Sequence, residues 1–231
     1  MGLIKMEIEN ISISYSSLKI RNLGLPKKIQ HRALAGVSIK ISDGETIAIM
    51  GNNGAGKSTL LKFLAGKIRP SSGSAFIEGK ILHLSGVNPG FDPLLSPRQN
   101  VQWLAPIYGG DGSLTNQDVE RFSDIGEAYD RPVKTLSAGM KGRVGFGFAT
   151  SLDPDILLID EVLGVGDPVF KAKAMDRLRK MIDRSGIVLL STHSVGLVKE
   201  LCSRCIVLND GIIVHDGDVH TGIDSYLKDR S

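Results

Sequence analysis

The feature that most constrains this chain is a glycine-rich loop between a short apolar run and a helix-like segment. The run ends at Met50, and residues 51–58 follow it as Gly-Asn-Asn-Gly-Ala-Gly-Lys-Ser. Glycines at this spacing let successive backbone N–H groups turn toward one anion, and the helix that follows adds the positive end of its dipole. Lys57 can reach the terminal phosphates of a nucleotide, and the Ser58 hydroxyl can ligate Mg²⁺. The alternative is a glycine-rich turn without a ligand; the flanking strand and helix favour a phosphate loop.

Composition limits the class of protein. The 231 residues suffice for one sizeable α/β domain, and 42% hydrophobic with 23% charged residues is typical of a soluble globular chain. A net charge of +3 is too small to indicate a nucleic-acid partner, although it is compatible with a position near an anionic membrane face. Glu7 and Glu9 interrupt any signal-peptide pattern, and no apolar run approaches the roughly 18 residues that span a bilayer. We therefore expect a cytoplasmic protein that reaches a membrane only through a partner.

Hydrophobic periodicity and turn residues predict an α/β order of elements. An alternating strand that ends at Tyr15 is followed by a polar, basic loop over 16–33, and Asp43-Gly44 is typical of a hairpin turn. The remaining predictions are strands over 34–41, 46–50, 74–78, 80–84, 155–160, 187–191 and 206–208, with helices from 57 to about 66, over 97–108, 116–129, 137–152, 170–184 and 195–201, and a last helix ending at Lys228.

A pair of acids extends the candidate site. Residues 156–159 are apolar, and Asp160 and Glu161 follow them directly. The carboxyl ends of parallel strands are where α/β sheets bind ligands, so Asp160 would lie beside the phosphate loop and hold Mg²⁺ through water. Glu161 could then orient the water that attacks the γ-phosphate. The alternative is a helix N-terminus enriched in acids.

A third segment, Leu-Ser-Ala-Gly-Met at 136–140, places Ser137 as the N-cap of a helix whose free N–H groups could receive a phosphate. Alone, this would be an ordinary capped helix. It closely resembles the Leu-Ser-Gly-Gly-Gln signature of ATP-binding-cassette ATPases, and the phosphate loop, signature, Asp-Glu strand end and His193 follow that family's order and spacing. The resemblance covers essentially the whole chain. It implies a P-loop NTPase (RecA-like) core with a flanking antiparallel β layer and an inserted α-helical subdomain.

The resemblance also implies domain limits. The chain would be a single ATPase domain over residues 1–231. Residues 1–85 and 151–231 would form the α/β nucleotide-binding core, and residues 86–150 would form the helical signature subdomain.

Transferred residue by residue, the family pattern implies a site for ATP and Mg²⁺ that two copies of the chain complete. Glu161, His193 and Lys57 would be catalytic, while Ser58 and Asp160 would serve Mg²⁺. The signature of one copy faces the phosphate loop of the other, so a homodimer is expected. The residues expected to contact nucleotide are Tyr15, Gly51, Asn52, Asn53, Gly54, Ala55, Gly56, Lys57, Ser58, Thr59, Ser137, Gly139 and Asp167.

Several of these assignments have simpler alternatives. His193 could be an exposed loop histidine, and Tyr15, expected to stack on adenine, could merely pack at a strand end. Cys202 and Cys205 form a lone C-x-x-C, for which buried thiols are favoured over a redox or zinc site. Trp103 could contact a partner or fill a core.

Departures from the family pattern indicate a branch. The Q-loop glutamine is missing from its expected place near residues 85 and 86, and Ala138 and Met140 replace the usual Gly and Gln. The segments 137–141, 160–167 and 191–194 look like those of the ATPase subunits of bacterial exporters of capsule, O-antigen or teichoic-acid polysaccharides. Some O-antigen members carry a C-terminal carbohydrate-binding domain, which is not expected here because the sequence stops at Ser231.

The leading hypothesis is therefore an ATP-hydrolysing subunit that drives export of a lipid-linked cell-surface polysaccharide. It would sit peripherally at the cytoplasmic face of the inner membrane, bound to an integral membrane permease that makes most of the cargo contacts, with no nucleic-acid partner. The alternatives are an importer or lipid exporter of the same family, a soluble ATPase without a transport role, and a nucleotide-binding module without turnover. Intact Lys57, Asp160, Glu161 and His193 argue against the last.

Overall fold

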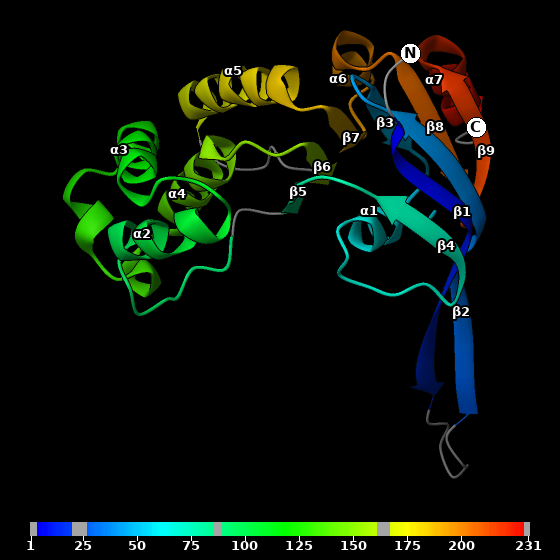
Figure 1. The fold of residues 1–231 in the computed structure, drawn as a ribbon, viewed down its shortest axis with the longest axis horizontal. Helices are drawn as coiled ribbons and strands as arrows, with labels where there is room; N and C mark the ends of the chain where they lie inside the picture. The colour runs from blue at the N-terminus through cyan, green and yellow to red at the C-terminus, as the bar shows by residue number, and fades with distance from the viewer. Residues whose placement is uncertain (1–3, 20–26, 86–88, 161–166, 229–231) are drawn as a thin grey trace. The chain divides into compact units, whose positions relative to one another are not determined.

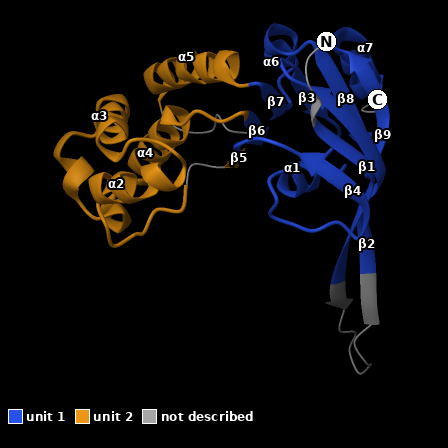
Figure 2. Cartoon of the chain, in the orientation of Figure 1, with its two compact units in different colours: residues 1–83, 156–160, 186–231 blue, residues 84–155, 161–185 orange. Residues whose placement is uncertain are grey.

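The computed structural model describes residues 4–19, 27–85, 89–160 and 167–228, and the chain forms two compact units. The first unit holds Met1–His83, Ile156–Asp160 and Gly186–Ser231, and the second holds Leu84–Asp155 and Glu161–Ser185 (Figure 2). The α/β fold class predicted from the sequence is confirmed. The predicted division of one ATPase domain into core and signature subdomain stays a prediction.

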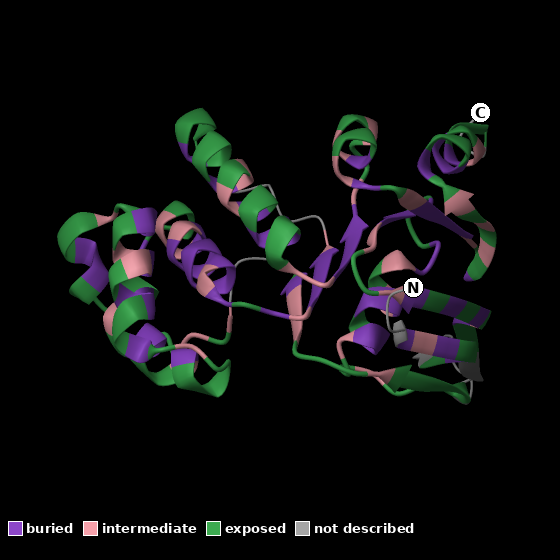
Figure 3. Ribbon diagram, turned by 45° about the horizontal axis from the view of Figure 1, so that its top comes forward, coloured by how far each residue is buried: buried purple, intermediate pink, exposed green. Residues whose placement is uncertain are grey.

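A six-stranded sheet is the centre of the first unit, in the order β5-β6-β7-β3-β8-β9. Strands β6, β7, β3 and β8 run parallel, and β9 pairs antiparallel with β8. The middle strands are nearly continuous apolar runs because both of their faces are covered, and they are coloured as buried in Figure 3. The strands are β3 (Thr46–Met50), β5 (Ile81–Ser85), β6 (Ile156–Asp160), β7 (Ile187–Ser191), β8 (Arg204–Asn209) and β9 (Ile212–Asp218).

A second, antiparallel sheet has the order β2-β1-β4 and comprises β1 (Ile4–Lys19), β2 (Lys27–Ser42) and β4 (Ser72–Ile77). This sheet is the expected β layer. Strand β4 pairs only with the Met6–Ser12 part of β1. Farther along, residues 14–19 pair with residues 27–32 alone, and this two-stranded ribbon extends beyond the sheet (Figure 1).

Helix α1 (Lys57–Leu64) packs between the two sheets. It buries Leu60, Leu61, Phe63 and Leu64 against alternate residues of both. Because side chains alternate along a strand, the residues of β3, β6 and β7 that face α1 include Ile49, Leu158 and Leu189. Helices α6 (Val195–Leu201) and α7 (Val219–Lys228) complete the unit, and α7 packs on β8 and β9.

The second unit is helical. Helix α2 begins at a full capping box, in which Ser96 and Gln99 exchange side-chain and backbone hydrogen bonds. The core of the second unit is rich in aromatic rings, among them Phe122, Phe146 and Phe170. The helices are α2 (Pro97–Ile107), α3 (Gly112–Ser123), α4 (Ala138–Ser151) and α5 (Pro168–Arg184), with 3₁₀ helices at Gly126–Asp130 and Val133–Thr135.

Arg177 joins three of these helices. Its guanidinium donates to both carboxylate oxygens of Asp118 on α3, to Thr150 Oγ1 (2.7 Å) and to the Gly147 carbonyl (3.2 Å) on α4. The same group lies over the Phe122 ring, 4.5 Å from its centroid. A planar, five-donor group suits such a junction, since it satisfies several acceptors at fixed angles.

Three predictions about the elements are wrong. Residues 16–19 and 27–33 are strand rather than loop, because β1 continues to Lys19 and β2 begins at Lys27; residues 20–26 lie outside the described residues. The turn at Asp43-Gly44 exists, but it joins strands of different sheets rather than a hairpin. The helix predicted over 116–129 is α3, which begins earlier, at Gly112, and ends at Ser123. It begins there because Asp111 caps it, accepting from Leu114 N at 2.8 Å.

Replacing Arg177 with Met should lower the free energy of unfolding by about 2–3 kcal/mol, because the half-buried Asp118 carboxylate and the Gly147 carbonyl lose their donors. The matched control is Lys180→Met, which removes an exposed ion pair with Asp176 and should cost no more than about 0.5 kcal/mol. Urea unfolding followed by circular dichroism measures both. Equal losses in the two variants would contradict the role given to Arg177.

Candidate nucleotide-binding site

The phosphate loop joins the central strand β3 to helix α1. Gly51, Gly54 and Gly56 have φ values of 147°, 85° and 108°, which side chains rarely adopt. A Cβ on Gly56 would also lie 2.6 Å from the Ala33 carbonyl oxygen. The glycines therefore give the loop both its backbone conformation and its close packing against β2, as a cradle of N–H groups requires.

Exposure differs along the loop. Lys57 Nζ donates to the carbonyls of Gly51 (2.8 Å) and Asn52 (3.0 Å), which holds the ammonium group over the loop. A lysine held there can stabilise the negative charge of a bound phosphate. Asn52, Asn53, Gly54 and Ser58 are exposed, Lys57 and Thr59 are half-buried, and Ala55 and Gly56 are buried.

Three strands end side by side at the carboxyl edge of the large sheet. Asp160, the last residue of β6, is in register with Ser191 of β7, which is in register with Ile49 of β3. Residues in register across parallel strands share a face, so Asp160 lies on the α1 face. Two strand spacings of about 4.8 Å separate it from β3. Asp160 thus lies on the face of the sheet that α1 covers, and a Mg²⁺ shared with Ser58, near the start of α1, stays a prediction.

Buried polar atoms without partners support an ion and its water at this edge. Ser191 is 1% exposed and its hydroxyl has no hydrogen-bond partner among the described residues. Both ring nitrogens of His83 on β5 are also buried and have no hydrogen-bond partner among the described residues. Burial and the charge of Lys67 lower the pKa of His83, while the charge of Asp160 acts to raise it. Buried polar groups are normally satisfied, so these atoms fit a hydrated cation held by Asp160. Neither residue was predicted as a site residue: Ser191 only begins the segment 191–194 that resembles the family branch, and His83 belongs to no motif.

His193 follows β7 and is exposed. Its Nδ1 lies 3.1 Å from the hydroxyl of Tyr226, a residue of α7 that is only 1% exposed. A hydroxyl that donates to Nδ1 leaves the proton of a neutral imidazole on Nε2, available for a phosphate oxygen. Tyr226 was missed by the sequence because 33 residues separate it from His193.

The signature residues lie in the second unit. Ser137 is the N-cap of α4, and its hydroxyl accepts from Met140 N at 3.2 Å. Ser137 and Gly139 are both exposed, and a Cβ on Gly139 would meet nothing closer than Ser137 Oγ at 4.0 Å. An exposed helix start with no bulky side chain over it is open to an anion.

Asp167 is the N-cap of α5. One carboxylate oxygen accepts from Val169 N and Phe170 N, at 3.0 Å each, and the other accepts from Arg143 at 2.5 Å. The Phe170 N–H, with other backbone donors and the charge of Arg143, lowers the pKa of Asp167. Arg143 belongs to the signature helix α4, so it joins that helix to the start of α5 directly. Arg143 was not predicted as a site residue, because its partner Asp167 lies 24 residues away in the chain.

Two predicted site residues remain. Tyr15 is 43% exposed and lies within β1, opposite His31, so the alternative of a tyrosine packed at a strand end is wrong in its geometry. Its contact with adenine stays a prediction. Glu161 lies outside the described residues, as do residues 161–166 of the expected D-loop and residue 86 of the expected Q-loop position.

Comparison with known proteins identifies the family. The ABC transporter family profile matches residues 34–164, more than half of the chain. The chain belongs to the ABC transporter family. Its relatives include the O-antigen export system ATP-binding protein RfbB of Klebsiella pneumoniae, 35% identical over 90% of this chain and 86% of RfbB. The polysialic acid transport ATP-binding protein KpsT of Escherichia coli is 35% identical over 96% of both chains.

Other ABC transporter proteins agree with this assignment. The chain is 36% identical to the ABC transporter protein AbcA of Aeromonas salmonicida over 85% of its own length, and it spans 65% of AbcA. A solved dimeric ATP-binding cassette, MJ0796 bound to ADP and Pi, shares the fold with a TM-score of 0.73 and 23% identity, covering 93% of this chain and 98% of that chain. The family resemblance drawn from the motifs is confirmed.

The C-x-x-C of this ABC transporter protein consists of buried thiols. Cys202 ends α6 and Cys205 lies in β8, and they are 7% and 0% exposed. Neither forms a disulfide, and no metal-binding group of His, Cys, Asp and Glu occurs among the described residues. Burial raises the pKa of both thiols to about 12. The preferred interpretation from the sequence is confirmed over a reactive pair.

The two thiols should not react with a disulfide reagent at pH 8 while the protein is folded, because a pKa near 12 leaves the thiolate almost unpopulated. Both should react once guanidinium unfolds the chain and their pKa returns to its ordinary value. Absorbance of the released thiolate measures the reaction. Rapid labelling of the folded protein at pH 8 would contradict this assignment.

Replacing Tyr226 with Phe should lower kcat for ATP hydrolysis about tenfold, because the ring nitrogen of His193 loses the hydroxyl that orients it. Tyr108→Phe, at a half-exposed tyrosine of the second unit, is the matched control. A Tyr226 variant with unchanged kcat would show that the contact only packs α7.

Proposed function

We propose that the protein is the ATP-binding and hydrolysing subunit of an exporter of a lipid-linked cell-surface polysaccharide, working with a separate permease. The observation that carries the proposal is the carboxyl edge of the large sheet, where the phosphate loop, Asp160 and His193 occur together on β3, β6 and β7. Relatives with export-system names that align over nearly the whole chain supply the cargo class.

The residues that end or follow β3, β6 and β7 have separate roles in ATP binding and hydrolysis. The loop N–H groups and Lys57 bind the phosphates and neutralise charge that develops as the γ-phosphate leaves. Ser58 and Asp160 would hold Mg²⁺, which would stabilise negative charge on the phosphates when bound. Glu161, which directly follows β6, accepts a proton from the attacking water, and His193 donates from Nε2 to the γ-phosphate.

A second copy of the chain completes the site. Ser137 and Gly139 offer an exposed helix start in the second unit, and no described contact within the chain covers it. In the homodimer these residues bind the γ-phosphate held by the partner's loop, so ATP joins the two copies and hydrolysis releases them. Arg143 and Asp167 keep the signature helix in a fixed position against α5.

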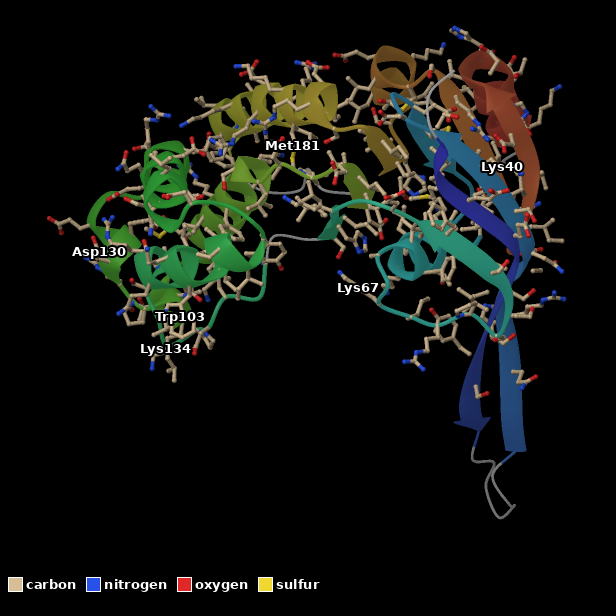
Figure 4. The ribbon with its side chains drawn as sticks, in the orientation of Figure 1. Lys40, Lys67, Trp103, Asp130, Lys134 and Met181 are labelled. Carbon is tan, nitrogen blue, oxygen red and sulfur yellow. The ribbon has the colours of Figure 1, made fainter. Side chains whose placement is uncertain are left out.

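The permease docks on the second unit. Trp103 and Ile107 lie one turn apart on α2 and are 74% and 73% exposed, so the alternative of a core tryptophan is wrong. Leu94, just before the helix, is 64% exposed. Trp103 is labelled in Figure 4. Exposed aromatic and aliphatic side chains of this kind are typical anchors of protein interfaces.

The same proposal places the protein at the cytoplasmic face of the membrane, held there by its permease. Among the described residues, no helix has the length and apolar character needed to cross a bilayer. The membrane-spanning path for the cargo would then belong to the partner.

Glu161→Gln should lower steady-state ATP hydrolysis at least about 100-fold while ATP binding persists, because the general base is lost and the phosphate cradle is not. Lys57→Ala should weaken ATP binding itself. Glu127→Gln, an exposed carboxylate of the second unit, should leave both unchanged. Phosphate release and nucleotide titration measure the two effects. Full turnover by the Glu161 variant would refute the catalytic assignment.

The cargo is tested in cells with the same variants. Cells whose only copy carries Glu161→Gln should accumulate the lipid-linked polysaccharide on the cytoplasmic side of the membrane. The protein should also co-purify with a polytopic membrane protein. Normal surface polysaccharide in these cells, or a complex with soluble proteins only, would refute the export function while leaving the ATPase assignment to the kinetic test.

A further inference from the structure

The strand pair β1–β2 changes register beside the phosphate loop. Ile13 of β1 is opposite Leu34 of β2, but the next residue of β1, Ser14, is opposite Arg32. One step along β1 therefore corresponds to two steps along β2, and the extra residue is Ala33. Such a β-bulge often re-aims side chains next to functional sites.

The bulge decides which way His31 faces. In a regular strand, residues three apart point to opposite faces, so His31 and Leu34 would lie on opposite sides of the sheet. The extra residue shifts the alternation by one position, and His31 lies on the same face as Leu34, directly opposite Tyr15. Arg32 lies on the other face, where its guanidinium donates to Ser12 Oγ at 3.1 Å.

The face that His31 shares with Leu34 also carries the phosphate loop. Ile13 and Leu34 belong to the apolar core that buries α1. A Cβ on Gly56, the last loop residue before α1, would lie 2.9 Å from Leu34 Cδ2. Tyr15 and His31 are the next pair on this face, two residues along β1 from Ile13, which is about 7 Å. One nucleotide bound in the loop can therefore reach both rings.

Both rings are open to a ligand. Tyr15 is 43% exposed, and His31 is exposed as well. The Cβ atoms of residues directly opposite each other in an antiparallel pair lie about 5 Å apart, so the two rings are neighbours on one surface. Two neighbouring aromatic rings suit a flat nucleobase, because every base can stack on an aromatic side chain.

We propose that His31 is a base-binding residue and that the purine base of ATP stacks across the Tyr15 and His31 rings. This role rests on the proposed function, because the loop must bind a nucleoside triphosphate. His31 was not predicted as a site residue: it lies in the stretch predicted as a loop, and only the bulge turns it toward the nucleotide.

A purely structural pair is the alternative. Tyr15 and His31 could stabilise the two strands by packing on each other, as aromatic cross-strand pairs do. That role predicts a loss of stability when His31 is truncated. Base binding predicts instead a loss of affinity that is confined to ligands with a base.

The test compares MgATP with magnesium tripolyphosphate, which has the phosphates but no base. In calorimetric titrations of the full chain, His31→Ala should weaken MgATP binding about tenfold, because stacking on one ring is lost, and should change tripolyphosphate binding less than about twofold. His31→Phe keeps an aromatic face and should bind both ligands within about twofold of the parent. Unchanged MgATP binding by His31→Ala, equal losses for the two ligands, or a His31→Phe variant as weak as His31→Ala would overturn the proposal.

Gln30→Ala is the matched control. Gln30 is exposed and precedes His31 in β2, so its side chain projects from the opposite face of the strand. This variant should bind MgATP as the parent does. Equal weakening in the Gln30 and His31 variants would indicate a general effect on the strand pair and refute the base site.

Further outcomes separate the possible causes. The urea midpoint of His31→Ala should match that of the parent, and a lowered midpoint with unchanged MgATP affinity would make the pair structural only and overturn the proposal. A parent protein that hydrolyses MgATP but binds tripolyphosphate just as tightly would refute the base site and leave the proposed function standing. A parent protein that binds neither ligand would refute both.

Discussion

The structure of the first unit depends on backbone-to-backbone packing around the phosphate loop. Gly56 of the loop and Gly211, in the turn between β8 and β9, both approach the Ala33 carbonyl so closely that a Cβ on either would lie 2.6 Å from it. Gly211 also links the elements by hydrogen bonds: its N–H donates to Ala55 O at 3.0 Å, and its carbonyl accepts from Ala35 N at 2.8 Å. Three segments distant in sequence thus meet where the nucleotide phosphates are expected.

This constraint explains the layered arrangement around α1. The loop can reach β2 only if the antiparallel sheet packs against α1. The parallel sheet packs against another side of the same helix. The apolar residues of α1 are correspondingly buried by both sheets. A short helix of eight residues is not stable alone, so its position depends on this burial. The same face of the parallel sheet carries Asp160 and Ser191, which places the expected metal ligand beside the helix that begins with Lys57 and Ser58.

The second unit is held differently, by aromatic rings and by guanidinium groups at helix junctions. Arg177 satisfies acceptors on two helices, Arg98 bridges Glu120 and Asp130, and Arg143 joins the signature helix to Asp167. Trp103 and Ile107 remain exposed on this unit, as the proposed docking surface for the permease requires. Arginines at helix junctions are hard to find from sequence, because hydrophobic periodicity counts every arginine as polar whether it is buried or exposed.

By itself, the sequence determined the phosphate loop, the acidic strand end, the signature helix and the order of the α/β elements, because each depends on residues close together in the chain. Glycine positions, N-caps and apolar runs are local signals, and β7 and α6 match their predicted limits. Only the tertiary structure decided that residues 14–19 pair with residues 27–32 and that Tyr226 contacts His193. It also decided that the Ser191 hydroxyl and the ring nitrogens of His83 are buried without a hydrogen-bond partner among the described residues. The physical reason is that pairing and burial arise between residues distant in sequence, and no local pattern records them.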